Sequence, residues 1–226
     1  MNDDLIVEQI LVGPMQNFVY LIGSRATREA VLVDPAWDIP GLLERAAARD
    51  LRVTHALVTH YHPDHVGGNV FGLDVPGLAQ LLDAQPTKVV VNKNEVDGLK
   101  KITGLSDSDC LVVEGGDTLT IGEQQIRFLH TPGHTPGSQC FLVGERLVSG
   151  DTLFIGSCGR VDLPGGNAEQ LYESLTGVLM KLDDKTILLP GHAYGGHEST
   201  IGHEKKTNSV LQMKSRADWM RLMGHA

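Results

Sequence analysis

Thr59-His60-Tyr61-His62-Pro63-Asp64-His65 is the most informative stretch of this chain, and it closes a β-type run that begins at Ala56. The stretch contains the pattern H-x-H-x-D-H, whose imidazole and carboxylate groups are typical ligands of zinc and iron. His60 and His62 lie two positions apart, so on an extended backbone both side chains point to the same side. Asp64 and His65 follow where we expect a turn into a helix, and their side chains can reach a second metal position nearby. The spacing therefore predicts a metal site.

Three further His or Asp residues follow later β-type runs, and each lies beside a glycine. The pairs are Gly133-His134, Gly150-Asp151 and Gly191-His192. Loops at strand ends are where sheet proteins usually carry their sites. Alone, each pair would be an ordinary turn, but together with the first motif they predict one shared site. The remaining histidines match no ligand position and are interpreted as structural or surface residues: His55, His130, His197, His203 and His225.

The composition of the 226 residues excludes several classes of function. The formal net charge is −9, which argues against nucleic-acid binding because that affinity depends largely on Lys and Arg. We expect no membrane association, because no run of five like charges and no apolar run of about 20 residues occurs. The acidic start Met1–Asp4 does not resemble a signal peptide. The three cysteines form no C-x-x-C pair, so we expect a cytoplasmic protein without a disulfide framework.

Short runs rich in Val, Ile, Leu and Phe predict strands, and amphipathic segments between some of them predict helices. Asp38 is expected to cap one helix, Asn167 with Gln170 a second, and residues 207–223 are expected to form a third. This order indicates sheets packed together and covered by helices. We expect one domain, residues 1–226, of two similar halves at about 1–110 and 111–226. The expected strands are Leu5–Leu11, Phe18–Ile22, Ala30–Asp34, Ala56–Thr59, Lys88–Val91, Ile126–His130, Cys140–Val143, Arg146–Ser149 and Thr186–Leu189.

With these motifs the chain resembles the metallo-β-lactamase superfamily, and within it the glyoxalase II-like and persulfide dioxygenase-like branch. The resemblance runs from Val33-Asp34-Pro35, through the metal motif and the three glycine pairs, to Ser199–Gly202. It implies a four-layer αββα sandwich, an α/β (α+β) fold, with the site at one edge of the sheets. It also implies a supporting role for Asp34. The implied ligands are His60, His62 and His134 for one metal, Asp64, His65 and His192 for a second, and Asp151 as the bridge.

The first functional hypothesis is a dinuclear metallohydrolase that cleaves a thioester or related activated ester, like hydroxyacylglutathione hydrolase. Two divalent ions, zinc above all and otherwise iron or manganese, would share a bridging hydroxide near pH 7. Asp64 would orient this nucleophile or accept its proton, and Tyr194 would donate a hydrogen bond to the oxyanion. Asp151 stands where β-lactamases of this fold typically carry Cys, Ser or His, so antibiotic hydrolysis is not expected. A glutathione conjugate is the suspected substrate, although too few residues follow His192 for the helical domain of full-length glyoxalase II.

The second hypothesis is a persulfide dioxygenase of the same branch, which would oxidise glutathione persulfide. One Fe(II) would be held by His60, His134 and Asp151. The segment Gly156–Arg160 resembles that group, whereas Leu163–Gly166 looks more like the hydrolases of the branch. A lactonase is a further alternative, because dinuclear members open lactones by the same chemistry. A metal-binding protein without activity is disfavoured, because every expected ligand is present.

Three features outside the ligand set are candidates for substrate binding. Arg160 could bind a substrate carboxylate, or it could form a structural ion pair with Asp162. The apolar stretch Val70–Pro86 is expected to line or cover the substrate entrance, with a core helix as the alternative. Cys158 lies near the expected site and is interpreted either as an oxidant-sensitive thiol or as a small apolar residue. The expected partner is a small molecule, and homodimer formation is left open.

Overall fold

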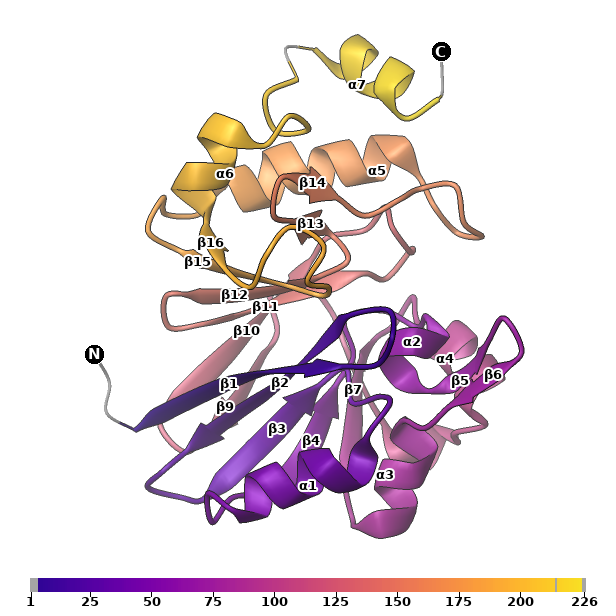
Figure 1. Ribbon diagram of the computed structural model, residues 1–226, viewed down its shortest axis with the longest axis vertical. Coiled ribbons are helices and arrows are strands. Elements are labelled where there is room, and N and C mark those ends of the chain that lie inside the picture. Colours follow the sequence, from indigo (N-terminus) through magenta and orange to yellow (C-terminus); the bar gives the residue numbers. More distant parts are fainter. Residues whose placement is uncertain (1–3, 214, 225–226) are drawn as a thin grey trace.

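The computed structural model describes residues 4–213 and 215–224, and it places two six-stranded sheets between two layers of helices (Figure 1). This is the αββα sandwich that the resemblance implied. His225 lies outside the described residues. In order across the first sheet come β1 (Leu5–Val12), β2 (Asn17–Ser24), β3 (Glu29–Val33), β4 (Arg52–Leu57), β7 (Lys88–Asn92) and β8 (Cys110–Val113). Across the second come β16 (Ser199–Thr200), β15 (Ile187–Pro190), β12 (Arg146–Gly150), β11 (Gln139–Val143), β10 (Gln124–His130) and β9 (Thr118–Ile121).

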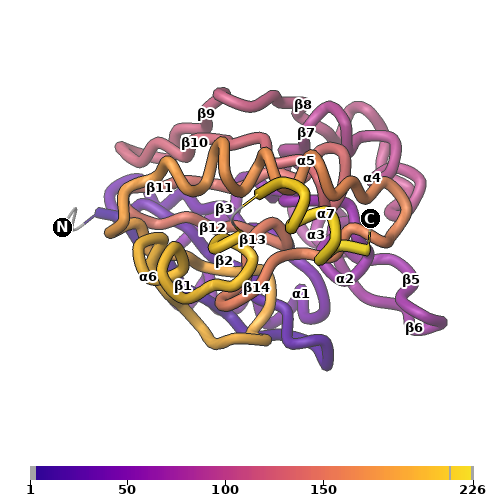
Figure 2. Tube along the Cα trace, turned by 90° about the horizontal axis from the view of Figure 1, so that it is seen from above, coloured from indigo at the N-terminus to yellow at the C-terminus, as the bar shows by residue number. Residues whose placement is uncertain are grey.

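Helices cover the outer face of each sheet, and two short hairpins complete the fold (Figures 1 and 2). The hairpin of β5 (Gly68–Val70) and β6 (Leu73–Val75) projects from the body of the molecule in both views. The helices are α1 (Ile39–Ala47), α2 (Pro63–Val66), α3 (Leu78–Ala84), α4 (Val96–Thr103), α5 (Ala168–Glu173), α6 (Ile201–Thr207) and α7 (Arg216–Leu222). The hairpins are β5 (Gly68–Val70) with β6 (Leu73–Val75), and β13 (Leu153–Phe154) with β14 (Ser157–Cys158).

Alternating side chains of the strands build three apolar layers. In β2, Val19 and Leu21 face the layer beneath α1 and α3, whereas Phe18 and Tyr20 face the layer between the sheets. The third layer lies between the second sheet and α5, α6 and α7, and contains the fully buried Trp219. Burial on both faces explains why the central strands read as continuous apolar runs in the sequence.

The predicted strands are all present, with shifted ends in some cases. The run expected at 56–59 is the end of the longer strand β4, and His60 follows it in a loop. The predicted caps are also present, because Asp38 accepts a hydrogen bond from the Gly41 amide and Asn167 accepts one from the Gln170 amide. The sequence missed the short strands β5, β6, β8, β9, β13, β14 and β16.

The prediction of one helix over residues 207–223 was wrong. Asn208 ends α6 with an extended backbone, and its buried side-chain amide donates to the carbonyl oxygens of Phe154 and Ser157. Ser215 then begins α7, accepting a hydrogen bond from the Asp218 amide. The polar side chains therefore divide the segment, because hydrogen bonds to a neighbouring hairpin compete with helix continuation.

Candidate metal centre

The metal motif lies between the end of a central strand and a short helix. β4 ends at Leu57, and α2 begins at Pro63, so His60 and His62 lie on the connecting loop while Asp64 and His65 lie on the helix. Proline in the first turn is favourable because its missing N–H would have no partner in the helix. The change from loop to helix places Asp64 and His65 beside the first two histidines, and the ring centroids of His60 and His65 are 4.3 Å apart.

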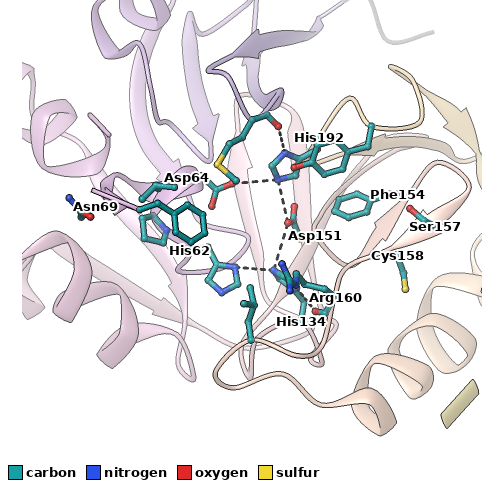
Figure 3. A pocket seen from close by; sticks show the side chains of 16 residues that line it. His62, Asp64, Asn69, His134, Asp151, Phe154, Ser157, Cys158, Arg160 and His192 are labelled. Atoms are coloured by element: carbon teal, nitrogen blue, oxygen red, sulfur yellow. Dashed lines mark hydrogen bonds and ion pairs between the residues drawn. The ribbon is translucent and has the colours of Figure 1, made fainter. Parts of the chain in front are cut away.

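The three later ligand candidates come from the second sheet. His134 follows β10, Asp151 follows β12 directly, and His192 follows β15. Strands β12 and β15 are parallel neighbours, so the side chains that follow their carboxyl ends emerge at the same edge of the sheet. Figure 3 shows His134, Asp151 and His192 facing His62 and Asp64 across one cavity.

Six of the seven predicted ligands form two groups of donors. His60, His62 and His134 make the first donor group, and Asp64, His65 and His192 make the second, with the donor atoms of each group within 4.8 Å of one another. In the first, Nδ1 of His62 lies 2.9 Å from Nε2 of His134. In the second, Nε2 of His65 lies 3.1 Å from Nε2 of His192.

Asp151 lies between the two groups. Its Oδ2 is 3.7 Å from Nε2 of His134 in the first group and 3.4 Å from Nε2 of His192 in the second. Its Oδ1 is 3.4 Å from Nε2 of His65. One carboxylate therefore faces both groups, as expected of a bridging ligand.

Hydrogen bonds at the opposite ring nitrogen orient four of the histidines. Nδ1 of His134 lies 2.7 Å from the carbonyl oxygen of Arg160, and Nδ1 of His192 lies 2.9 Å from that of Met15. A carbonyl oxygen only accepts, so each Nδ1 carries the proton and each Nε2 keeps its lone pair for a cation. His60 and His65 are held in the same way, through Thr59 Oγ1 at 3.0 Å and Asp34 Oδ2 at 3.0 Å.

Asp34 supports both groups at once. Its carboxylate accepts hydrogen bonds from the Thr59 amide at 2.7 Å and the Thr59 hydroxyl at 2.5 Å, besides its contact with His65. Asp34 also lies within ligand distance of His60 and His65. Because its oxygens already hold Thr59 and His65, we interpret Asp34 as a support of the ligands, which is the role that the resemblance implied.

The donor set fits metal ions. Among the residues that the structure describes, Nε2 of His60 and Oδ1 of Asp151 are buried without a hydrogen-bond partner. Buried polar atoms without a partner are costly. Histidine nitrogens that face one another at 2.9 and 3.1 Å, with carboxylates beside them, are satisfied when a cation lies between them.

The protonation states of the site also favour a bound cation. Burial alone would raise the pKa of Asp151, but His65 and His192 outweigh it and lower that pKa to about 2. In turn the facing carboxylates outweigh burial and raise the pKa of His65 well above its ordinary value, so positive charge is favoured between these groups. The pKa of Asp64 is also lowered, because His65 and the amide of Asn17 outweigh burial. Burial lowers the pKa of His62 to about 4 and that of His60 well below its ordinary value, so both are neutral ligands at pH 7.

Sequence reasoning missed three residues that hold the second donor group. Asn17 donates from Nδ2 to Oδ2 of Asp64 at 2.8 Å. Trp37 donates from Nε1 to the carbonyl oxygen of Asp64 at 2.9 Å, and Met15 holds His192. Of the three, Trp37 has an unusual local feature, a φ of 73°, and a sequence alone does not reveal that.

The cavity over the donors has a volume of about 530 Å³. Val70 and Phe71 of the β5–β6 hairpin line it, so the predicted entrance position is right for this part of Val70–Pro86. It is wrong for α3, where Leu78 and Leu81 are fully buried in the core. Apolar side chains form much of the remaining wall: Met15, Phe154, Leu163 and Tyr194.

The other predicted site residues also lie at this cavity. Tyr194 stacks on His192, with ring centroids 4.5 Å apart, and burial raises its pKa to about 12. Arg160 lines the cavity, but its guanidinium forms two hydrogen bonds of 2.6 Å to Asp162, so the expected ion pair is present. Burial raises the pKa of the Cys158 thiol to about 12, so this cysteine is protonated at pH 7.

The family of this chain follows from comparison with known proteins. The family model described as the metallo-beta-lactamase superfamily matches residues 12–192. The chain belongs to this superfamily. Among solved structures of the superfamily, ETHE1 from Myxococcus xanthus is 35% identical, with a TM-score of 0.83 over 97% of this chain and 90% of that chain. The predicted family is therefore confirmed.

Relatives with two different activities match this superfamily member. Hydroxyacylglutathione hydrolase GloC of Haemophilus influenzae is 33% identical over 199 residues, which cover 83% of this chain and 90% of GloC. The human mitochondrial persulfide dioxygenase ETHE1 is 30% identical over 225 residues, covering 98% of this chain and 81% of that protein. Both predicted branches are thus represented among the relatives, and the choice of reaction depends on the site.

Proposed function

We propose that this protein is a dinuclear metallohydrolase that cleaves a thioester or a related activated ester, as a hydroxyacylglutathione hydrolase does. The observation that carries the proposal is the complete second donor group beside the first, with Asp151 facing both. This donor set supports a centre with two ions, and the number of ions bound decides between it and a mononuclear centre. Asp34, Met15 and Asn17 hold the second group in place for a second cation.

The donor groups would each hold one divalent ion, for which zinc is our first choice and iron or manganese the others. Such ions would supply a nucleophile at neutral pH, because coordination to a divalent metal lowers the pKa of a water molecule to about 7. Asp64 lines the cavity and is kept ionised by Asn17 and His65, so its carboxylate can orient the attacking water by accepting a hydrogen bond from it. The same carboxylate is a ligand candidate, and we propose both roles for it.

Tyr194 and Arg160 are the proposed substrate-binding residues. Tyr194 keeps its phenolic proton at neutral pH because burial raises its pKa to about 12, so it can donate a hydrogen bond to a developing oxyanion. Arg160 is exposed at the cavity and already pairs with Asp162. A substrate carboxylate, such as one in a glutathione conjugate, would have to exchange with Asp162 for this guanidinium.

The apolar wall of the cavity supports a substrate with an apolar part beside the scissile bond. Phe71 has an exposed fraction of 101% and sits at the tip of the β5–β6 hairpin, where it lines the cavity mouth. The side chain of Asn69 holds this tip through hydrogen bonds of 2.9 Å to Asp74 and to the Gly72 amide. We propose that Phe71 covers the acyl or thiol group of a bound substrate.

The persulfide dioxygenase is the second candidate, favoured by the similarity to human ETHE1 over 98% of this chain. In that case one Fe(II) would be held by His60, His134 and Asp151, which also face one another here. Lactone opening is a further alternative within the hydrolase class.

The test is the identity and number of metals per chain, measured by elemental mass spectrometry on protein purified without chelators or a metal-affinity tag. Close to two ions per chain together with hydrolysis of a thioester or lactone panel supports the hydrolase. Close to one iron per chain, with oxygen uptake on glutathione persulfide, replaces it by the dioxygenase. The variant His62→Ala also distinguishes the hydrolase from the dioxygenase. His62 is a ligand only in the dinuclear centre, so the variant should lose metal if the protein is the hydrolase and keep its iron if it is the dioxygenase.

The remaining expectations stay predictions. We propose a single domain of two similar halves, in line with one sheet drawn from residues 5–113 and the other from 118–200. Within the described parts of the chain, no helix has the length and apolar character needed to cross a bilayer. The cytoplasmic location and a homodimer also remain predictions.

A further inference from the structure

Glu95 is a fully buried carboxylate with no part in the donor groups. It is the residue that precedes α4, a position where a side chain often caps the helix, yet within the described residues its carboxylate makes no cap hydrogen bond. Its oxygens instead accept from the backbone amides of Tyr61, at 2.7 Å, and Gly137, at 2.6 Å. The side chain therefore joins two other segments of the chain.

These two segments supply every member of the first donor group. Tyr61 lies between His60 and His62, so its amide belongs to the backbone that positions both histidines. Gly137 lies in the loop that carries His134. Hydrogen bonds to an ionised carboxylate are shorter and stronger than neutral ones. Glu95 thus ties the two ligand-bearing loops to each other.

The close approach needs glycine. A Cβ atom on Gly137 would lie 2.6 Å from Cγ of Glu95, and one on Gly98 would lie 2.7 Å from the Tyr61 ring. Both distances are shorter than real Cβ contacts. The backbone at these points is therefore shaped to bring the Gly137 amide to the carboxylate and Tyr61 against α4.

The second donor group has separate supports. Asp34 and Met15 orient its histidines, and Asn17 holds its carboxylate, so none of its members depends directly on Glu95. We propose that Glu95 is a positioning residue that fixes the separation of the His60–His62 and His134 loops, and so sets the cation affinity of the first donor group alone. This inference rests on the metal centre of the proposed function and not on its reaction.

The variant Glu95→Gln tests the proposal, and Glu204→Gln is the matched control. Glu204 is also fully buried and also holds a loop, accepting from the Gly156 amide at 2.8 Å and the Ser199 hydroxyl at 2.6 Å. That loop carries no donor of either group. Both substitutions remove the charge of a buried carboxylate at constant size. In Glu95→Gln the side-chain NH₂ opposes a backbone amide, whereas in Glu204→Gln it can face the Ser199 hydroxyl, which also accepts a hydrogen bond.

Metal-free proteins are titrated with Zn²⁺ against a chromophoric chelator, in the wild-type background and with His192→Ala, which removes a member of the second group. The titration is run at pH 8, because burial raises the pKa of Glu95 to about 7 and its carboxylate must be ionised. In the His192→Ala background we expect Glu95→Gln to weaken the remaining zinc affinity about 10- to 100-fold, the usual effect of an outer partner. We expect Glu204→Gln to leave it unchanged.

Unchanged zinc affinity in Glu95→Gln overturns the proposal, and so does equal weakening in both variants. Circular dichroism and thermal unfolding of the metal-free proteins verify the fold. If Glu95→Gln does not fold, Gly137→Ala pushes the amide away from the carboxylate without changing any charge, and the same loss of affinity is expected. The number of ions bound by the unmodified protein tests the proposed dinuclear centre, so the two proposals can fail separately.

Discussion

The two donor groups of the site use the same kinds of ligand but are supported in different ways. The first group lies on two loops, and His62 is only half-buried. Its other two histidines, His60 and His134, are at most 2% exposed, as are His65 and His192 of the second group. Asp34, Asn17 and Met15 hold its three members through side-chain and backbone contacts.

This contrast shows where precision in the site comes from. The Glu95 carboxylate joins the backbones of the two loops that carry the first group. The members of the second group are held separately, by the side chains of Asp34 and Asn17 and the carbonyl oxygen of Met15. A rigid backbone and a rigid set of outer partners are two ways to hold ligands in place. We expect the first group, whose His62 is partly exposed, to exchange its cation faster, and the following variants compare the supports of the two groups.

Asp151→Asn should have the largest effect, because Asp151 is the predicted ligand that faces both groups. The change keeps the size but removes the charge, so we expect both ions to be lost and kcat/KM to fall by more than about 100-fold. Elemental analysis and a hydrolysis assay measure this. Asp162→Asn, an exposed carboxylate beside the same cavity, is the control and should retain its metals. Two ions retained in Asp151→Asn would rule out the bridge.

Asp34→Asn should weaken both groups together, since Asp34 reaches His65 directly and His60 through Thr59. We expect zinc affinity at both positions to fall about 10- to 100-fold. The readout is competition with a chelator, which resolves the two dissociation constants. Weakening of one constant alone would mean that the two groups do not share this support.

Asn17→Ala should act on the second group only, because Asn17 contacts Asp64 and the edge of His65. We expect a loss of about tenfold in the affinity of that group, the lower end for an outer partner. Metal titration of this variant, set beside Glu95→Gln, gives a direct comparison of the two groups. An equal effect of Asn17→Ala on both constants would contradict the separation.

Phe71→Ala should have the smallest effect, on substrate binding without any effect on the metals. Removing an apolar ring that covers part of the substrate costs about 1 kcal/mol, so KM for an apolar acyl thioester should rise about fivefold at constant kcat. Leu73→Ala is the control, because Leu73 lies on the same hairpin, is 51% exposed and does not line the cavity. A similar rise in KM for both variants would indicate a general change of the hairpin.

The candidate ligands could be named from the amino-acid sequence, and the structure brings them together in two donor groups with Asp151 between them. The H-x-H-x-D-H motif and the three later glycine pairs are local patterns, and each reports the chemistry of its own segment. The apolar runs located the strands that carry these segments, because buried strands of a sandwich must be apolar on both faces. The helix starts at Asp38 and Asn167 could also be predicted, because a helix cap depends on residues only a few positions apart in the chain.

The residues that support the ligands became visible only in the packed structure. Asn17 and Asp64 lie 47 positions apart in the chain, and Glu95 and Gly137 lie 42 apart, so no local pattern marks either pair. Each support is a single polar side chain whose role arises when distant segments meet. Packing also decides that one part of Val70–Pro86 lines the cavity and another part belongs to the core. It buries Leu78 beneath the first sheet and leaves Phe71 at the cavity mouth. Residue type and spacing are properties of the chain, whereas burial and partners depend on the packed fold.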